Sequence, residues 1–399
     1  MRESNEISNP PGIGPMSTLS PLLDRLRVIA ETGNGGWRTL PPQAYYSPEL
    51  FDLEKEKVFR AHWLCIGRVD QVANPGDYMA IDVMGEPVVL LRDLDGTLRV
   101  LSNVCRHRWM KVCQGRGNKK RLVCPYHAWT YDLNGRLHNA LEMKDCPDFE
   151  PDKVALPTIR HEVWQGFVYI NLNGKAAPLS PQLLWVDEAI EEFGLGSWEV
   201  VKTVDCGEYP WDWKVMQDNG ECFHHLGAHL KTFEQNYPAR GTITRCQGST
   251  IIQWCPAREQ RRVVAEDGLE YAPYYFRPVP GLTEIQRTSF ILVYVLPNFF
   301  IYLQSDYGMK LRVFPVSAGK IRMFTDFLVP PDARTIPDFD QRLAEVVEFF
   351  NRFNDEDFAV NSAVQQGLQS AWAQTAPLSH LEAHNQHVAC WIAKQLVGV

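Results

Sequence analysis

The sequence predicts an α+β fold, in which a small antiparallel β domain precedes a larger domain of antiparallel sheet flanked by helices. Short apolar runs alternate with turn residues over 63–103, as is typical of a small sheet. Longer alternating runs over 290–328 predict a second sheet, and helical periodicity returns over 338–370. Because a stretch with the composition of a linker, 174–181, lies between the two sheet regions, we expect two domains.

The composition is that of an ordinary globular protein. The 399 residues are 45% hydrophobic and 11% aromatic, which is enough for two substantial cores. A formal net charge of -8 argues against nucleic acid or an anionic membrane as a partner. No apolar stretch approaches the ~18 residues of a membrane span, and the ten cysteines are scattered rather than spaced as a disulfide framework. We therefore expect a reduced, cytoplasmic protein.

The first part of the chain divides into a lead-in and a β domain. Residues 1–40 are rich in proline and glycine and are expected to be a flexible lead-in with one short helix at 19–30. Ser47 followed by Pro48 is a helix N-terminus pattern, so a helix should run to about His62. The β domain then extends to residue 175, with strands expected at 63–69, 78–84, 88–92, 98–103, 129–132, from 136 onward, and at 163–171.

The second domain, residues 176–399, mixes helices with longer strands. Helices are expected near 183–193, across 214–230 and over 338–370. The strands expected in its antiparallel sheet are 290–296, 299–304, 310–314 and 321–328.

Two short motifs in the β domain each place a histidine just after a cysteine. Cys105-Arg106-His107 is followed, after sixteen residues, by Cys124-Pro125-Tyr126-His127. Two thiolates and two imidazoles suit either zinc or a [2Fe-2S] cluster with the cysteines on one iron and the histidines on the other. Common zinc modules group Cys with Cys and His with His, so the order within each pair favours the cluster.

A second candidate metal site lies in the run from Glu221 to His229, which holds an acid and three histidines. With a distant carboxylate, two of these histidines would form the face that binds non-haem Fe(II) and leaves positions open for dioxygen and substrate. Helix geometry pairs His225 with His229, four residues apart, whereas His224 with His229 needs a distorted turn, which Gly227 would allow.

Asp357 is the predicted carboxylate ligand. It shares an apolar stripe with Leu343, Phe350 and Val364, which recur every seven residues, and a carboxylate on such a stripe is costly unless it is paired or coordinated. The adjacent acids 355 and 356 fall off the stripe and are expected to be solvated. The alternative is that Asp357 is an ordinary acid on a helix surface.

Together these residues resemble the oxygenase component, or α-subunit, of the Rieske non-haem iron oxygenases, over nearly everything after residue 40. The motifs that carry the resemblance are 102–108, 124–129, Trp213-Lys214, 221–229, Glu356-Asp357 and 366–368. The resemblance implies that Cys105 and Cys124 bind one cluster iron and that His107 and His127 bind the other. It also implies that His224, His229 and Asp357 bind the mononuclear iron, with His225 as a neighbour.

Glu221 stands where family members carry an acid that bridges a cluster histidine of one subunit to the mononuclear site of the next. Many dioxygenases have aspartate there, and glutamate resembles the branch with carnitine and glycine-betaine oxygenases. Two features depart from the family pattern. Trp109 replaces a common glycine, and the segment from Trp213 to Glu221 is a residue or two shorter than usual, which leaves Asp218 as a second bridging candidate.

The resemblance implies the terminal oxygenase of a multicomponent system. A flavin reductase, with or without a ferredoxin, would carry electrons from NAD(P)H to a homotrimer that uses dioxygen to hydroxylate or oxidatively demethylate a small organic substrate. A quaternary-amine or N-methyl compound is favoured, with aromatic-ring dioxygenation as the alternative. The aromatic segments 271–276 and 299–302 supply either a cation-π cage or plain core.

Two readings from other classes remain. An electron-carrier Rieske protein needs the first site alone and leaves the histidine cluster and Asp357 unexplained. A zinc-stabilised binding protein would be colourless and would contain no sulfide. A further group of histidines, His380, His384 and His387, shares one helical face and is interpreted as a polar or inter-subunit surface.

Overall fold

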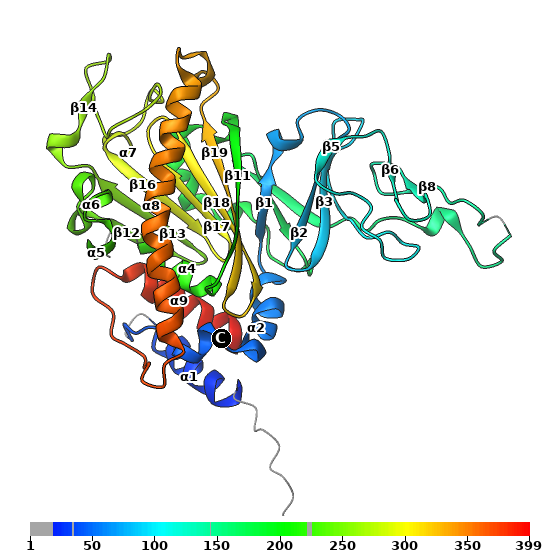
Figure 1. Ribbon diagram of the computed structural model, residues 1–399, viewed down its shortest axis with the longest axis horizontal. Coiled ribbons are helices and arrows are strands. Elements are labelled where there is room, and N and C mark those ends of the chain that lie inside the picture. The colour runs from blue at the N-terminus through cyan, green and yellow to red at the C-terminus, as the bar shows by residue number, and fades with distance from the viewer. Residues whose placement is uncertain (1–18, 34–35, 144, 222–225) are drawn as a thin grey trace, which may run out of the picture.

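The computed structural model describes residues 19–33, 36–143, 145–221 and 226–399. Figure 1 shows a larger part built on one long sheet and a smaller β part beside it. The predicted α+β class, with a small β region followed by a larger helix-and-sheet region, is confirmed. None of the described helices is long and apolar enough to cross a membrane. Every cysteine in the described ranges is free.

The smaller part contains three antiparallel sheets, with strand orders β4-β3-β2-β5, β6-β7-β8 and β1-β10-β9. A turn at Asn134-Gly135 joins β7 to β8 in a hairpin, with Gly135 at φ 91°. One strand over 163–171 was the wrong prediction, because Gln165 and Gly166 both have positive φ and turn the chain between two strands. The strands are β1 (Leu64–Arg68), β2 (Asp77–Val83), β3 (Glu86–Arg92), β4 (Leu98–Ser102), β5 (Arg116–Asn118), β6 (Leu122–Val123), β7 (Thr130–Tyr131), β8 (Leu137–Asn139), β9 (Arg160–Trp164) and β10 (Phe167–Asn171).

Helices from both ends of the chain pack together at the base of the larger part (Figure 1). The N-terminal α1 (Leu19–Thr32) lies against the C-terminal α9 (Ala383–Val397) and buries Leu26 completely, so from residue 19 the expected flexible lead-in is a packed helix. The predicted cap at Ser47 is present, since its hydroxyl accepts from the amide of Leu50 at 3.1 Å and starts α2 (Pro48–Glu54). A π-helical turn then continues the helix over Lys55–Phe59.

The larger part is organised on a seven-stranded antiparallel sheet of order β11-β19-β18-β17-β16-β13-β12. The long helix α8 (Phe339–Leu368) runs across this sheet (Figure 1). The sheet strands are β11 (Glu199–Tyr209), β12 (Ile243–Gln247), β13 (Thr250–Pro256), β16 (Ser289–Val295), β17 (Phe299–Leu303), β18 (Gly308–Ser317) and β19 (Lys320–Val329). A small hairpin of β14 (Val263–Val264) and β15 (Glu270–Tyr271) and the helices α3 (Leu184–Ile190), α4 (Trp213–Asp218), α5 (Leu226–His229), α6 (Phe233–Asn236) and α7 (Glu284–Thr288) complete it.

The two parts are joined through β1. A bulge in β1 between Cys65 and Gly67 frees the carbonyl of Ile66, which accepts from Arg312 of β18 at 2.9 Å. On the other side of Cys65, the buried amide of Asn298 donates to its carbonyl at 3.0 Å and accepts from its amide at 2.9 Å. These bonds satisfy the edge of β1 with groups from the larger part, so the two parts share a polar seam as well as a hydrophobic core.

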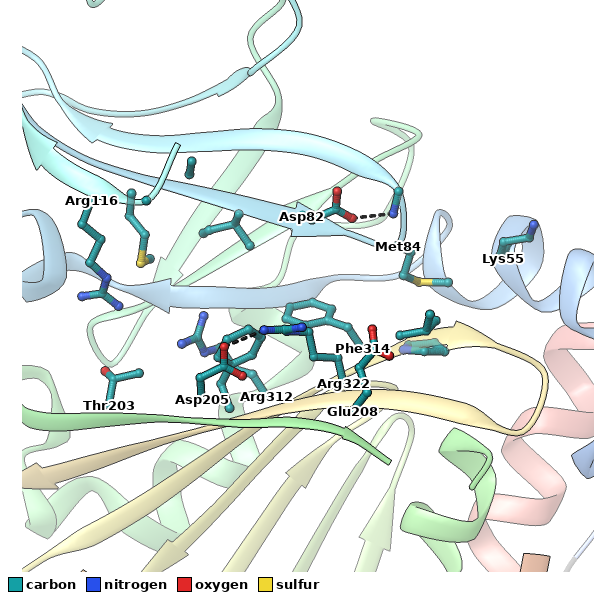
Figure 2. A pocket seen from close by; sticks show the side chains of 18 of the residues that line it. Lys55, Asp82, Met84, Arg116, Thr203, Asp205, Glu208, Arg312, Phe314 and Arg322 are labelled. Carbon is teal, nitrogen blue, oxygen red and sulfur yellow. Dashed lines mark hydrogen bonds and ion pairs between the residues drawn. The ribbon is translucent and has the colours of Figure 1, made fainter. Parts of the chain in front are cut away.

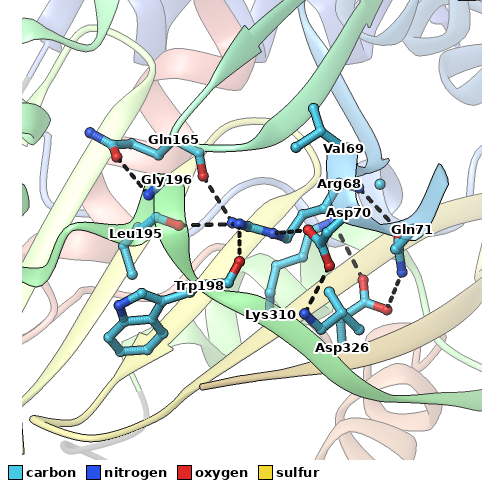
Figure 3. Close-up of polar contacts among 12 residues, drawn as sticks. Arg68, Val69, Asp70, Gln71, Gln165, Leu195, Gly196, Trp198, Lys310 and Asp326 are labelled. Atoms are coloured by element: carbon cyan, nitrogen blue, oxygen red, sulfur yellow. Dashed lines mark hydrogen bonds and ion pairs between the residues drawn. The ribbon is translucent and has the colours of Figure 1, made fainter. Parts of the chain in front are cut away.

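Arg68 is the centre of this seam (Figure 3). Its guanidinium is fully buried, pairs with Asp70 at 2.8 Å and donates to the carbonyl of Gln165 at 2.8 Å. It also donates to two carbonyls in the loop before β11, those of Leu195 at 3.1 Å and Trp198 at 2.7 Å. A buried cation is stable only when its donors are satisfied, and here the acceptors come from three separate segments.

Gly166 is a glycine at which an added methyl group would collide with a buried side chain. Its φ is +78°, and a Cβ there would lie 2.6 Å from Arg68 Nη2. We expect Gly166→Ala to lower the free energy of unfolding by about 3 kcal/mol, because it strains the turn and displaces a buried charge. Gly268→Ala is the matched control, with φ +77° and nothing within 4 Å of the added atom, and should cost about 1 kcal/mol. Urea unfolding of the two variants measures the difference, and equal losses would contradict the role given to Arg68.

Candidate iron-binding sites

The two Cys-His motifs form a pair of loops with the same backbone hydrogen bonds. In each, the cysteine amide donates to the carbonyl five residues on, and the cysteine carbonyl accepts from the amide four residues on, at 2.8 to 3.2 Å. The corresponding residues Trp109 and Ala128 have left-handed φ values of 57° and 56°. This conformation favours glycine, which accounts for the family preference at position 109. Trp109 adopts it with its ring 82% exposed.

The four predicted cluster ligands lie together in pairs. Cys105 and Cys124 are buried and close enough for their thiols to hydrogen-bond, and the rings of His107 and His127 meet edge-on at 4.6 Å between centroids. Nδ1 of His107 is buried and has no hydrogen-bond partner among the described residues. Burial and the neighbouring His127 lower the pKa of His107, which keeps its imidazole neutral, as a metal ligand must be. Paired thiols beside paired imidazoles fit a two-iron cluster.

Tyr131 contacts the loop of Cys105 through its hydroxyl group. Its fully buried hydroxyl lies 3.3 Å from Cys105 Sγ and accepts from the amide of Arg106 at 3.0 Å, so its proton is left to point at the sulfur. Hydrogen bonds to cluster sulfurs stabilise the reduced, more negative state. Sequence reasoning missed this residue because a tyrosine in a short strand is indistinguishable from core.

We expect Tyr131→Phe to lower the reduction potential of the cluster. Removing one hydrogen bond of about 1 kcal/mol from the reduced state corresponds to about 40 mV for one electron. A redox titration followed by EPR measures the shift. Tyr78→Phe is the control, because its hydroxyl bonds the carbonyl of Gln114 instead of a ligand, and an equal shift in both variants would contradict the assignment.

The predicted mononuclear site brings His229 and Asp357 together. His229 is the last residue of α5, and its Nε2 lies 3.0 Å from Oδ1 of Asp357, which α8 presents inward at 4% exposure. Two donors bound at right angles about 2.1 Å from one metal are themselves about 3 Å apart. The distance therefore fits adjacent ligands of one metal ion.

A second layer of side chains orients these two. Glu356 accepts from His229 Nδ1 at 2.8 Å and from the hydroxyl of Thr232 at 2.7 Å. Asn219 donates to Asp357 Oδ1 at 3.0 Å. The expectation that Glu356 is solvated was wrong: its carboxylate fixes the ring of His229, as carboxylate partners of metal-bound histidines do. The stripe pattern missed it because Glu356 approaches His229 from the side of α8.

His224 and His225 lie outside the described residues, so their pairing with His229 stays a prediction. The expected helix over 214–230 is interrupted, since α4 ends at Asp218 and a 3₁₀ turn follows over Asn219–Glu221.

The inward face of α8 is no longer apolar after Asp357. Val364 is 45% exposed, while Asn361 and Gln365 are buried. Polar side chains thus continue the inward face beyond the metal site.

Glu221 and Asp218 occupy different surroundings. Glu221 is buried at 8% exposure and lines a small cavity of about 130 Å³ that also includes Gln253 and His380. Asp218, three residues earlier, has a different partner, and its Oδ2 accepts from the hydroxyl of Tyr45 at 2.5 Å. Figure 1 places β6 and β8, on either side of the Cys124 loop region, at the opposite side of the molecule from α5. Within one chain the two candidate iron sites are therefore far apart.

The C-terminal histidines separate into different roles. His384 is fully buried, its Nε2 lies 2.9 Å from the carbonyl of Gln217, and burial lowers its pKa to about 3. The expectation of a shared polar or inter-subunit face is wrong for this residue. His387 lies 3.0 Å from the carbonyl of Gly248, and His380 borders the cavity of Glu221.

The two aromatic segments are largely core. Phe299 packs against Phe167 at 4.9 Å between centroids, and Tyr302 is buried. Tyr271 already has the guanidinium of Arg287 over its ring at 5.5 Å. Among the described residues, Phe353 and Phe233 lie beside the candidate metal site instead, with ring centroids 5.1 and 5.7 Å from that of His229.

A large cleft among the described residues lies away from both candidate sites. Figure 2 shows it between β2 and the β11–β19 region of the long sheet, with a volume of about 820 Å³. Arg116 enters it from the smaller part, and Asp205 of β11 and Arg322 of β19 pair on the sheet wall of the cleft at 2.5 Å. Its lining contains none of the predicted iron ligands, so size alone does not identify a substrate site here.

Two family models match separate parts of the chain. Residues 62–150 match the Rieske [2Fe-2S] domain, and residues 195–398, more than half of the chain, match the ring hydroxylating alpha subunit (catalytic domain). The carnitine monooxygenase oxygenase subunit of Acinetobacter pittii is 28% identical over 340 residues, 83% of this chain and 85% of that protein. The glycine betaine monooxygenase oxygenase subunit of Chromohalobacter salexigens is 26% identical over 372 residues, 86% and 82% of the two chains.

Solved structures share the fold. The quaternary ammonium Rieske monooxygenase CntA in complex with L-carnitine has a TM-score of 0.73 at 23% identity, over 91% of this chain and 98% of that chain. Naphthalene 1,2-dioxygenase from Rhodococcus sp. has a TM-score of 0.78 at 20% identity, over 95% and 99%. The resemblance inferred from the motifs is thereby confirmed. The chain belongs to the ring-hydroxylating α-subunit family and is a Rieske-type oxygenase, with a [2Fe-2S] domain followed by a non-haem iron catalytic domain.

Proposed function

We propose that this protein is the terminal oxygenase of a multicomponent system that hydroxylates or oxidatively demethylates a quaternary-amine or other N-methyl compound. Cys105 and Cys124, with His107 and His127, hold the cluster in a domain spanning 41–175. His224, His229 and Asp357 hold the mononuclear iron in a domain spanning 176–399. The bound iron supplies the activation of dioxygen, while the protein positions the substrate and controls access of water.

The observation that carries the proposal is the contact between His229 Nε2 and Asp357 Oδ1 at 3.0 Å. An electron carrier has no use for a second buried pair of ligands, oriented by Glu356 and Asn219. A carboxylate buried against an imidazole is stabilised when both bind one cation. The pair therefore supports an oxygenase rather than a carrier.

The substrate class rests on two further observations. The relatives that match most of the chain are named as carnitine and glycine betaine monooxygenase subunits. Phe233 and Phe353 are buried at 1% exposure and pack edge to face beside His229, with ring centroids 4.3 Å apart, so aromatic rings border the proposed iron site. Aromatic faces attract a quaternary ammonium, which has no hydrogen bond to lose on leaving water.

Electrons are proposed to come from NAD(P)H through a flavin reductase, with or without a ferredoxin, in the cytoplasm. They reach the mononuclear iron across a subunit boundary in a homotrimer, with Glu221 as the bridge. The separation of the two sites within one chain supports this arrangement (Figure 1). The bridging acid would accept a hydrogen bond from one imidazole on each side.

The test is turnover of anaerobically purified protein, containing about three irons and two sulfides per chain, with a reductase and a panel of substrates. Product formation from carnitine or glycine betaine, matched to oxygen consumed, supports the proposal. Diol formation from naphthalene would favour the ring-dioxygenase alternative. If the cluster is reduced and peroxide is released but no oxygenated product forms, the proposed substrate class is wrong.

A further inference from the structure

A group of buried ionisable side chains lies behind the segment that carries the mononuclear site. Lys214 Nζ lies between Oε1 of Glu54 at 2.7 Å and Oδ1 of Asp212 at 2.6 Å. All three are at most 1% exposed. Glu54 also accepts from the indole of Trp213 at 2.8 Å. One ammonium between two carboxylates leaves this group with excess negative charge when every member is ionised.

Asp218 adds a further acid at the edge of the group. It lies one helical turn after Lys214, on α4, and three residues before Glu221. Its Oδ2 accepts from Tyr45 at 2.5 Å, and part of its surface remains exposed. Buried acids so close together do not all lose their protons at neutral pH, since each added charge raises the free energy of the next ionisation.

The groups that face Asp218 act on its protonation in a known direction. Burial raises the pKa of Asp218 to about 7, the hydroxyl of Tyr45 opposes the rise, and the carboxyl of Glu221 adds to it. Lys214 lowers it and Asp212 raises it. From α9, Asn385 donates to the backbone carbonyl of Asp218 at 2.8 Å and His384 is held neutral.

The same short segment contacts the metal site. Asn219, the next residue after Asp218, donates to Oδ1 of Asp357 at 3.0 Å. Glu221 closes the following 3₁₀ turn. A proton held on Asp218 is therefore within one turn of Glu221, the acid proposed to bridge the two iron sites. It is also next to Asn219, which is hydrogen-bonded to the proposed ligand Asp357. Its partial exposure gives it a source of protons in solvent.

We propose that Asp218 is the proton store of the oxygenation, taking a proton from solvent and releasing it toward Glu221 when electrons arrive. This rests on the proposed function. Oxygenation of a C–H bond by dioxygen takes up two electrons and two protons and yields the hydroxylated product and one water, and the reductase supplies the electrons alone. In the release step the O–H bond of Asp218 breaks, its proton moves to the carboxylate of Glu221, and Tyr45 stabilises the carboxylate left behind.

The first test reads the proton directly, by infrared difference spectroscopy of the holoenzyme as pH is raised. The wild type should lose a protonated-carboxyl C=O band with a midpoint at or below about pH 7, because Asp218 keeps some contact with solvent. Asp218→Asn should remove that band while any band of Glu54 remains. Tyr45→Phe should move the midpoint upward, because the lost hydroxyl had stabilised the ionised form. Asp82→Asn, an exposed acid paired with Lys111, is the matched control and should change neither.

The second test is kinetic. Asp218→Asn should lower kcat about tenfold to 100-fold with KM unchanged and with iron and sulfide retained, since a positioned acid contributes about this much or more. The wild-type rate should fall as pH rises through the Asp218 pKa, and Tyr45→Phe should shift that fall to higher pH.

An Asp218→Asn enzyme with the wild-type band and pH profile would overturn the proposal. A Tyr45→Phe midpoint that moves downward or stays in place would also overturn it. If no panel substrate is oxygenated, the proposed function fails on product formation while the infrared titration still decides the protonation of Asp218.

Discussion

Replacing Asp357 by alanine should abolish oxygenation and leave the iron–sulfur cluster intact. In the proposed site the side chain is the charged ligand, and α8 holds it against His229 Nε2; its loss would leave a two-histidine site that cannot retain Fe(II). Iron per chain should fall by about one third while sulfide and the Rieske EPR signal remain. Product formation should drop by more than about 10³-fold.

Substitutions of two neighbouring acids on α8 serve as comparisons for the Asp357 variant. Glu356→Gln should keep the ligand set but lose the anchor of His229, with iron retention or turnover reduced about 10- to 100-fold. Asp355→Asn changes an exposed acid beside them and should behave as wild type. Full product formation by the Asp357 variant would contradict the proposal that this residue is an iron ligand.

Replacing Glu221 by glutamine should disconnect the two iron sites without removing either. A carboxylate accepts hydrogen bonds from two imidazoles at once, whereas an amide has one acceptor oxygen and would meet one imidazole with its own donors. We expect chemical reduction of the cluster to be normal and its reoxidation in a single turnover with substrate to slow about 100-fold. Stopped-flow absorbance of the cluster, with product quantified in the same samples, measures both.

Mixed oligomers distinguish transfer between subunits from transfer within one. A chain without the cluster, such as Cys105→Ser, and a chain without the iron, such as Asp357→Ala, should each be inactive alone. Co-expressed, they should recover part of the activity, because the intact cluster of one chain reaches the intact iron of another. Absence of recovery in verified mixed oligomers would contradict the inter-subunit route, whatever the effect at Glu221.

Residue patterns predicted the strands that alternate strongly and the inward position of the acid that breaks an apolar stripe. Asp357 was found because a lone acid among Leu343 and Phe350 is energetically conspicuous. Strand β11 was missed because it is an edge strand, half-buried and rich in charge along its length. Gln165-Gly166 was missed because the apolar end of β9 and the apolar strand β10, joined by two residues, resemble one continuous run.

The supporting side chains were harder to predict because their partners are distant in sequence. Glu356 reaches His229 across 127 positions, and Tyr45 reaches Asp218 across 173. Nothing local distinguishes such an acid from a solvated one. His384 was misassigned for the same reason, since the backbone carbonyl that satisfies it belongs to α4.

The packing of α9 against the iron-site segment sets an order for biosynthesis. The cluster loops close within residues 105–131, so a nascent chain can complete them while the catalytic part is still being synthesised. The iron site must wait for Asp357 and for α9, whose His384 and Asn385 bond to the backbone of α4. We therefore expect cluster loading to precede iron loading, and a chain that stops short of α9 to carry sulfide but little mononuclear iron.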